Sequence, residues 1–116
     1  MLDREQVQAV LVETDPTSTQ LSGHIVTECL VRNLPAMQTW YFEVREGALM
    51  SYGPAAFTDS RAVAGYVARI LGGAKVADLP FEEPTQVKLT INLKTARTLG
   101  LAIPPTLLAR ADEVIE

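Results

Sequence analysis

The sequence has one cysteine and one histidine in 116 residues. Cys29 therefore has no partner for an intramolecular disulfide, and Cys29 with His24 is too small a set for a Cys/His zinc site. Lysine and arginine number 10 against 14 aspartate and glutamate, without a basic cluster, which argues against a nucleic-acid partner. No apolar run approaches the roughly 20 residues of a membrane span. The first ten residues do not look like a secretory signal, so as written the chain is expected to be cytoplasmic.

The composition and the length of the chain indicate one folded domain. Hydrophobic residues make up 47% of the chain and charged residues 21%, a balance that argues against intrinsic disorder. A compact fold with this mass of 12.6 kDa is expected to keep about 6,200 Å² of accessible surface. Such a fold buries enough surface to need no disulfide or structural metal.

Strand and helix patterns alternate along the chain, which favours an α/β fold with a mainly parallel sheet. The clearest strand is the alternating segment Val87 to Leu93, and the clearest amphipathic helix carries apolar residues at helical spacing from Val63 to Leu71. The expected strands are 10–12, 35–39, 48–51, 87–93 and 114–115. The expected helices are 16–33, 63–71, 95–99 and 104–108, with an extended connector over 75–84.

Motifs of catalysis are missing. The sequence has no G-x-S-x-G, no phosphate-binding P-loop, no G-x-G-x-x-G and no H-E-x-x-H. His24 is interpreted as an ordinary surface or packed histidine, and Cys29 as a core residue on the apolar face of the first helix. The sequence therefore predicts neither an enzyme nor a cofactor.

Two loops are candidates for ligand binding because each follows a strand. In the first, Asp15 and Pro16 have the residue types of a helix N-terminus, so Asp15 is either a helix cap or a carboxylate that meets an ammonium group. In the second, Gly53 follows Ser51 and Tyr52, and marks either a close backbone approach to a ligand or a turn.

Three of the seven aromatic residues are adjacent, from Trp40 to Phe42. Aromatic side chains line many small-molecule pockets, but they also fill cores and interfaces between subunits. The sequence leaves these three interpretations open.

Several segments resemble the C-terminal part of one family. They are GALMSYGP (47–54) and residues 66–116, which contain Ile91-Asn92-Leu93-Lys94-Thr95-Ala96, Gly100-Leu101, Ile103-Pro104-Pro105, Leu107-Leu108 and Arg110-Ala111-Asp112-Glu113. AVLVETDPT (9–17) and LPA (34–36) fit as well, so the resemblance covers nearly all of the chain. By these motifs the chain is identified as a member of the ABC-transporter substrate-binding proteins of the tryptophan/tyrosine-binding type.

The resemblance implies a protein with a leader or lipid anchor, two α/β lobes of the type I periplasmic-binding-protein fold, and an ABC permease as its partner. A cleft between the lobes closes on a small ligand such as an amino acid. Residues 1–116 then correspond to the C-terminal lobe, a three-layer Rossmann-like unit, together with a crossover helix at about 57–72 that packs on the first lobe in relatives. The N-terminal lobe is expected to be absent.

Carried over by position, the ligand contacts implied by the resemblance fall in three places: Thr14, Asp15 and Thr17; Thr39 and Trp40; Ser51, Tyr52 and Gly53. Two positions depart from the family pattern. Relatives often have Asp-Asn-Thr where this chain has Asp15-Pro16-Thr17, and an acidic residue at the position of Trp40. Trp40 cannot hold an ammonium by an ion pair, but its ring can stack on an aromatic ligand or attract a cation.

Without the first lobe, the crossover helix is expected to expose an apolar stripe and so to promote a homodimer or higher oligomer. The stripe consists of Val63, Tyr66, Val67, Ile70 and Leu71. Two functional hypotheses follow: a truncated substrate-binding component of an ABC transporter that binds a small ligand, or a stand-alone dimerising domain with no transport role.

Overall fold

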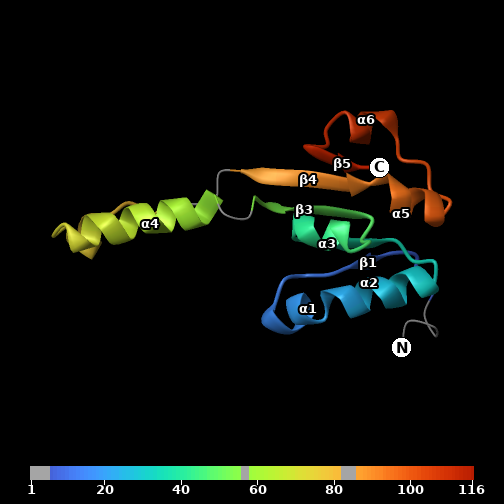
Figure 1. The fold of residues 1–116 in the computed structure, drawn as a ribbon, viewed down its shortest axis with the longest axis horizontal. Helices are drawn as coiled ribbons and strands as arrows, with labels where there is room; N and C mark the ends of the chain where they lie inside the picture. Colours follow the sequence, from blue (N-terminus) through green and yellow to red (C-terminus); the bar gives the residue numbers. More distant parts are fainter. Residues whose placement is uncertain (1–5, 56–57, 82–85) are drawn as a thin grey trace.

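The chain forms a five-stranded sheet with helices beside it, in a computed structural model that describes residues 6–55, 58–81 and 86–116 (Figure 1). The strands are β1 (Val10–Leu11), β2 (Ala36–Gln38), β3 (Met50–Pro54), β4 (Val87–Asn92) and β5 (Glu113–Ile115), in that order across the sheet. β1, β2 and β3 are parallel, β4 is antiparallel to β3, and β5 is parallel to β4. The predicted α/β fold with a mainly parallel sheet is confirmed.

The first predicted helix is divided into α1 (Pro16–Gln20) and α2 (Ser22–Val31). Leu21 separates them with φ −96° and ψ 5°, and serves as the C-cap of α1 and the N-cap of α2. Asn33 then adopts the left-handed conformation, φ 55°, which fits the predicted end of the helix. Cys29 and Val26 are buried on α2, so the prediction that Cys29 is a core residue is confirmed.

A short helix that the sequence analysis missed, α3 (Tyr41–Arg45), packs on the sheet. Its Val44 is fully buried, and the backbone oxygen of Val44 accepts a hydrogen bond of 2.9 Å from Asn92 Nδ2. Asn92 Oδ1 also accepts a bond of 3.0 Å from the Thr95 N–H and so caps α5 (Leu93–Thr98). One buried side chain at the end of β4 therefore connects α3 with α5.

Helix α4 (Thr58–Leu71) begins five residues before Val63, where the apolar spacing begins, and agrees with the crossover helix at about 57–72 that the resemblance implies. It projects from the body of the molecule (Figure 1). A short 3-10 helix, η1 (Val76–Asp78), lies within the predicted connector, of which residues 82–84 lie outside the described residues. Near the C-terminus follows α6 (Pro105–Leu108). None of the helices described is both long enough and apolar enough to cross a membrane.

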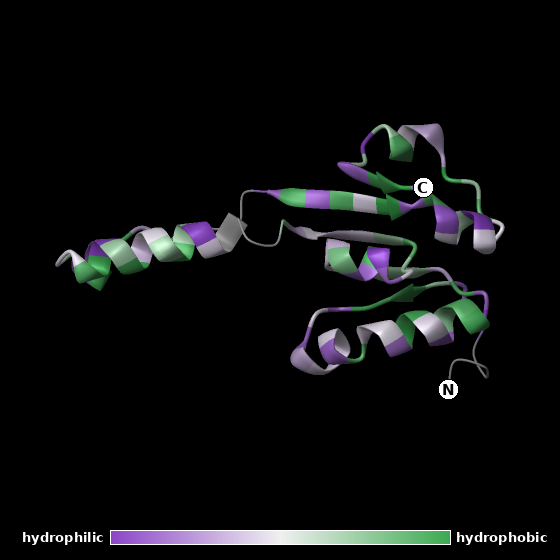
Figure 2. Cartoon of the chain, viewed as in Figure 1, coloured by the Kyte–Doolittle hydropathy of each residue, from purple (hydrophilic) through white to green (hydrophobic). Residues whose placement is uncertain are grey.

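The projecting helix makes the chain elongated. Its radius of gyration is 17.9 Å, whereas a compact domain of this length has about 13 Å. The accessible surface is 8295 Å², well above the roughly 6,200 Å² expected for a compact fold. Figure 2 shows hydrophobic residues along α4 that no strand of the sheet covers.

A row of polar side chains crosses the sheet on the face that α3 covers. Gln38, Ser51 and Thr90 are in register on β2, β3 and β4, and each is at most 2% exposed. Within the described ranges, Gln38 Nε2, Ser51 Oγ and Thr90 Oγ1 have no hydrogen-bond partner. Thr95, by contrast, donates its hydroxyl to the backbone oxygen of Gly47 at 3.0 Å.

This difference predicts opposite effects of two threonine-to-valine substitutions. Thr90→Val removes a buried hydroxyl without a partner, so the free energy of unfolding is expected to stay unchanged or to rise by about 1 kcal/mol. Thr95→Val breaks a hydrogen bond and strands the Gly47 carbonyl, so it is expected to cost about 1–3 kcal/mol. Urea titrations with equal slopes measure both values. An equal loss in the two variants would contradict the prediction.

Candidate functional site

An open groove of about 770 Å³ lies at the carboxyl ends of β1 and β2. Because the two strands are parallel, the segments that follow them meet at one edge of the sheet. Thr14 and Asp15 lead from β1 into α1, and Trp40 leads from β2 into α3. The lining residues are Thr14, Asp15, Pro16, Thr19, Gln20, Trp40 and Phe42.

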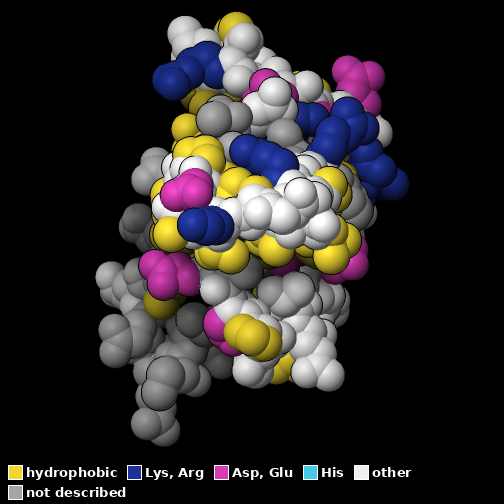
Figure 3. Space-filling model, turned by 90° about the vertical axis from the view of Figure 1, so that its left-hand side faces the viewer, with side chains coloured by type: hydrophobic (Ala, Val, Ile, Leu, Met, Phe, Trp, Pro, Cys, Tyr) yellow, Lys and Arg dark blue, Asp and Glu magenta, His cyan; other side chains and the backbone are white. Residues whose placement is uncertain are grey.

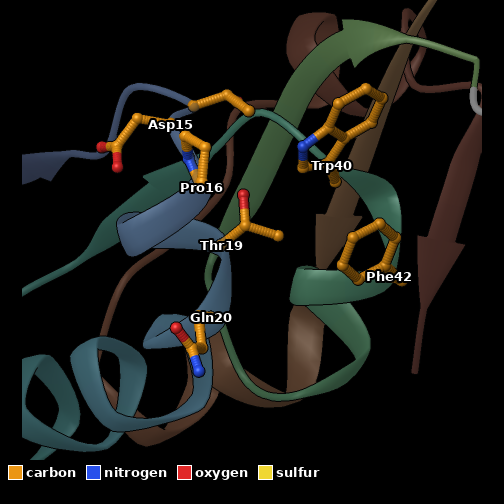
Figure 4. Close-up of a pocket in the computed structure, with 7 residues that line it drawn as sticks. Asp15, Pro16, Thr19, Gln20, Trp40 and Phe42 are labelled. Atoms are coloured by element: carbon orange, nitrogen blue, oxygen red, sulfur yellow. The ribbon is translucent and has the colours of Figure 1, made fainter.

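Two aromatic rings form one wall of the groove. The centroids of Trp40 and Phe42 are 6.2 Å apart with 10° between the ring planes, a stacked arrangement. Figure 4 shows both rings across from Pro16 and Thr19 of α1. Tyr41 meets Phe42 edge-on and lies 5.8 Å from the guanidinium of Arg45. Of the three adjacent aromatics, Trp40 and Phe42 line the groove.

Asp15 caps α1. Its Oδ1 accepts hydrogen bonds from the backbone N–H groups of Thr17 (2.7 Å) and Ser18 (3.1 Å), and Ser18 Oγ accepts from the Asp15 N–H. The N–H groups of Ser18 and Thr17 hold the pKa of Asp15 below its usual value, so the carboxylate is ionised at neutral pH. Figure 4 shows this carboxylate directed away from Trp40. The cap is shown, and the contact of Asp15 with a ligand stays a prediction.

The other predicted contacts are more scattered. Thr17 donates its backbone N–H to Asp15, and Thr39 precedes Trp40 with its carbonyl close to Gly53. Ser51 and Gly53 are buried. Tyr52, on the opposite sheet face, borders a second groove of about 410 Å³ together with Met37, Met50, Val87, Leu89, Leu107, Arg110 and Asp112. The structure thus brings Thr14, Asp15 and Trp40 together in one groove and places Ser51, Tyr52 and Gly53 elsewhere.

Four lining residues are not among the ligand contacts that the resemblance implies. Pro16, Thr19 and Gln20 lie on α1 at the spacing of one helix face, so the predicted helix start carried a usable signal for them. Phe42 was considered only as one of three aromatics, because α3 was not predicted.

The remaining candidates add no reactive group to this site. His24 is exposed on α2, and burial raises the pKa of the Cys29 thiol, which keeps it protonated. The described part of the chain holds no group of three or more side chains suited to a metal ion. The groove offers a stacked aromatic pair, hydroxyl and amide groups, and one carboxylate, which is a set for non-covalent binding.

Solved structures of other proteins share this fold. The chain superposes with a TM-score of 0.89 and 26% identity on a conserved domain protein from Vibrio cholerae, over 94% of this chain. It superposes with a TM-score of 0.87 and 29% identity on an ABC domain from Streptococcus pneumonia in complex with L-Trp, over 95% of this chain. In both cases this chain spans 37% of the other one.

A third structure supports the fold alone. It is the ligand-free, open form of a substrate-binding protein with adhesive properties from Clostridium difficile, with a TM-score of 0.61 and 20% identity; 91% of this chain covers 36% of that one. A search among curated protein sequences gives no significant match. The sequence profile of ABC transporter substrate binding proteins matches residues 3–115. With nearly its whole length matched, the chain belongs to the family of ABC transporter substrate-binding proteins.

Proposed function

We propose that the groove between α1 and α3 is one wall of the ligand site of an ABC transporter substrate-binding protein. Its ligand is a small molecule with a flat apolar group and an ammonium group, such as an aromatic amino acid. The observation that carries the proposal is the stacked pair of Trp40 and Phe42, which lines an open groove at the edge of a parallel sheet.

The aromatic wall supports an apolar, planar ligand. Phe42 is 38% exposed and Trp40 is half-buried, so both rings offer surface to a bound molecule. Offset stacking of a third ring adds about 0.5–1.5 kcal/mol to the gain from buried area. The similar domain from Streptococcus pneumonia holds L-Trp, a molecule that combines an indole ring with an ammonium group.

The polar end of the ligand is assigned to the α1 side of the groove. Asp15 is exposed and ionised at neutral pH, so it attracts a cation while Oδ1 caps the helix. Thr14, Thr19 and Gln20 add hydroxyl and amide groups to the same side. Recognition is non-covalent, and transport requires the bound molecule to be passed to an ABC permease.

Self-association through α4 is a second proposal, which rests on surface area. The chain exposes about 2,000 Å² more than a compact fold of its mass, which exceeds the roughly 800 Å² that each partner buries in a standard interface. On α4, the exposed fractions are 58% for Val63, 49% for Val67 and 83% for Leu71. Figure 3, viewed from the end that α4 occupies, shows hydrophobic side chains at the surface beside Lys and Arg. We propose that a second copy of this chain covers the stripe.

Ligand binding is tested by thermal unfolding with L-tryptophan, L-phenylalanine, glycine and adenine. A ligand of the folded state raises the midpoint as its concentration exceeds its dissociation constant. We expect a rise with the two aromatic amino acids, and none with glycine, which lacks a ring, or adenine, which lacks an ammonium group. No shift from any of the four, with a stable oligomer present, would favour a dimerising domain without a ligand.

Three variants separate the binding role from the cap. Trp40→Ala is expected to abolish the midpoint rise, since it removes half of the aromatic wall. Asp15→Asn keeps a side chain that caps helices and removes the charge, so it should lose the rise while keeping the unliganded midpoint. Ser18→Ala is the control: it weakens the cap outside the groove lining, so it should lower the midpoint and keep the rise. Retained binding in Asp15→Asn would leave Asp15 as a cap only.

The oligomer is tested by light scattering on the eluting protein at micromolar concentration. We expect at least twice the chain mass of 12.6 kDa, and a monomer for Val63→Lys with Val67→Lys, because two charges interrupt the stripe. Gly65→Lys is the matched control, since helical spacing places residue 65 on the opposite side of α4 and a Cβ there meets nothing within 4 Å. A monodisperse monomer of the unaltered chain would contradict the proposal.

A further inference from the structure

Gly53 on β3 passes unusually close to the segment that leads from β2 into α3. A Cβ atom at Gly53 would lie 2.3 Å from the Thr39 carbonyl oxygen and 2.8 Å from Thr39 Cγ2. Real Cβ contacts essentially never fall below 3.0 Å, and the obstacle here is backbone, which cannot rotate away as a side chain tip can. The φ of Gly53 lies outside the left-handed region, so what this position requires is space.

Thr39, which lies close to Gly53, is joined by one peptide bond to Trp40 of the groove lining. Thr39 precedes Trp40, which is the N-cap of α3, and the Trp40 N–H donates to Glu43 Oε2 at 3.0 Å. Trp40 in turn stacks on Phe42. The Thr39 carbonyl therefore lies at the point where the direction of α3 and the position of the Trp40 ring are set.

We propose that Gly53 is a positioning residue for the ligand groove: its missing side chain lets β3 approach Thr39, and this approach fixes where Trp40 stands. Gly53 itself does not touch the ligand, because it is buried and is not part of the groove lining. The consequence for ligand binding rests on the proposed function, whereas the consequence for Trp40 does not.

The test uses Trp40, which is the only tryptophan of the chain and therefore a specific reporter. In Gly53→Ala, Thr39 must move away from β3 until its oxygen clears the new methyl group. We expect a red shift of Trp40 emission and stronger quenching by acrylamide than in the unaltered chain, both without ligand. Gly65→Ala is the matched control, since a Cβ there meets nothing within 4 Å, and its emission should equal that of the unaltered chain.

The outcomes are distinct. A folded Gly53→Ala chain with unchanged emission and quenching overturns the proposal, whatever the groove binds. If far-UV circular dichroism shows the variant unfolded, the spectra are recorded in trimethylamine N-oxide, which favours compact states. A variant that stays unfolded there also overturns the proposal, because the contact then supports the whole sheet. A shifted Trp40 emission in Gly53→Ala, with no binding of the four compounds by the unaltered chain, supports the positioning role and contradicts the proposed ligand class.

Discussion

The parallel pairing of β1, β2 and β3 is the constraint on which the groove depends. Val10 pairs with Ala36, and Met37 with Met50, so the three strands end at one edge of the sheet. The segments that follow β1 and β2 begin helices there, and a groove forms between these two starts. Neither α1 nor α3 exceeds five residues, so neither is stable alone, and the sheet sets their separation.

The elements that the sequence predicted well are those whose signals are local. Asp15 and Pro16 begin a helix as their residue types indicate, and the alternation from Val87 becomes β4. Helix α3 was missed because its support is distant in the sequence: Asn92 holds the Val44 carbonyl across 48 positions. The break at Leu21 was missed as well, since an apolar residue at that position carries no stop signal.

The part of the candidate site that follows β1 and β2 was predictable. The rule that ligands bind beyond parallel strand ends indicated Thr14 and Asp15, whereas Trp40 was implied by the family resemblance; the structure places all three in one groove. Whether the predicted contacts on β3 lie in the same groove depends on the direction of the side chains along this strand. Because side chains alternate along a strand, Ser51 and Tyr52 cannot both face the same groove, and Tyr52 lies on the opposite side of the sheet. The contacts of Ser51, Tyr52 and Gly53 with a ligand, which the resemblance implies, stay predictions.

The groove has fewer polar groups than the resemblance implies for the family. The resemblance implies an asparagine at the position of Pro16, which has no N–H, and an acidic residue at the position of Trp40. Both changes move the balance of recognition from hydrogen bonds toward contact area, which the Trp40–Phe42 pair supplies. Asp15 is the one carboxylate in the lining, and its bonds to Thr17 and Ser18 keep it charged, so the proposed contact with an ammonium group depends on it. Since an open groove encloses a ligand on one side, tight binding requires a second wall, and under the proposed function the contact area of Trp40 decides how much of the ligand's surface this chain buries.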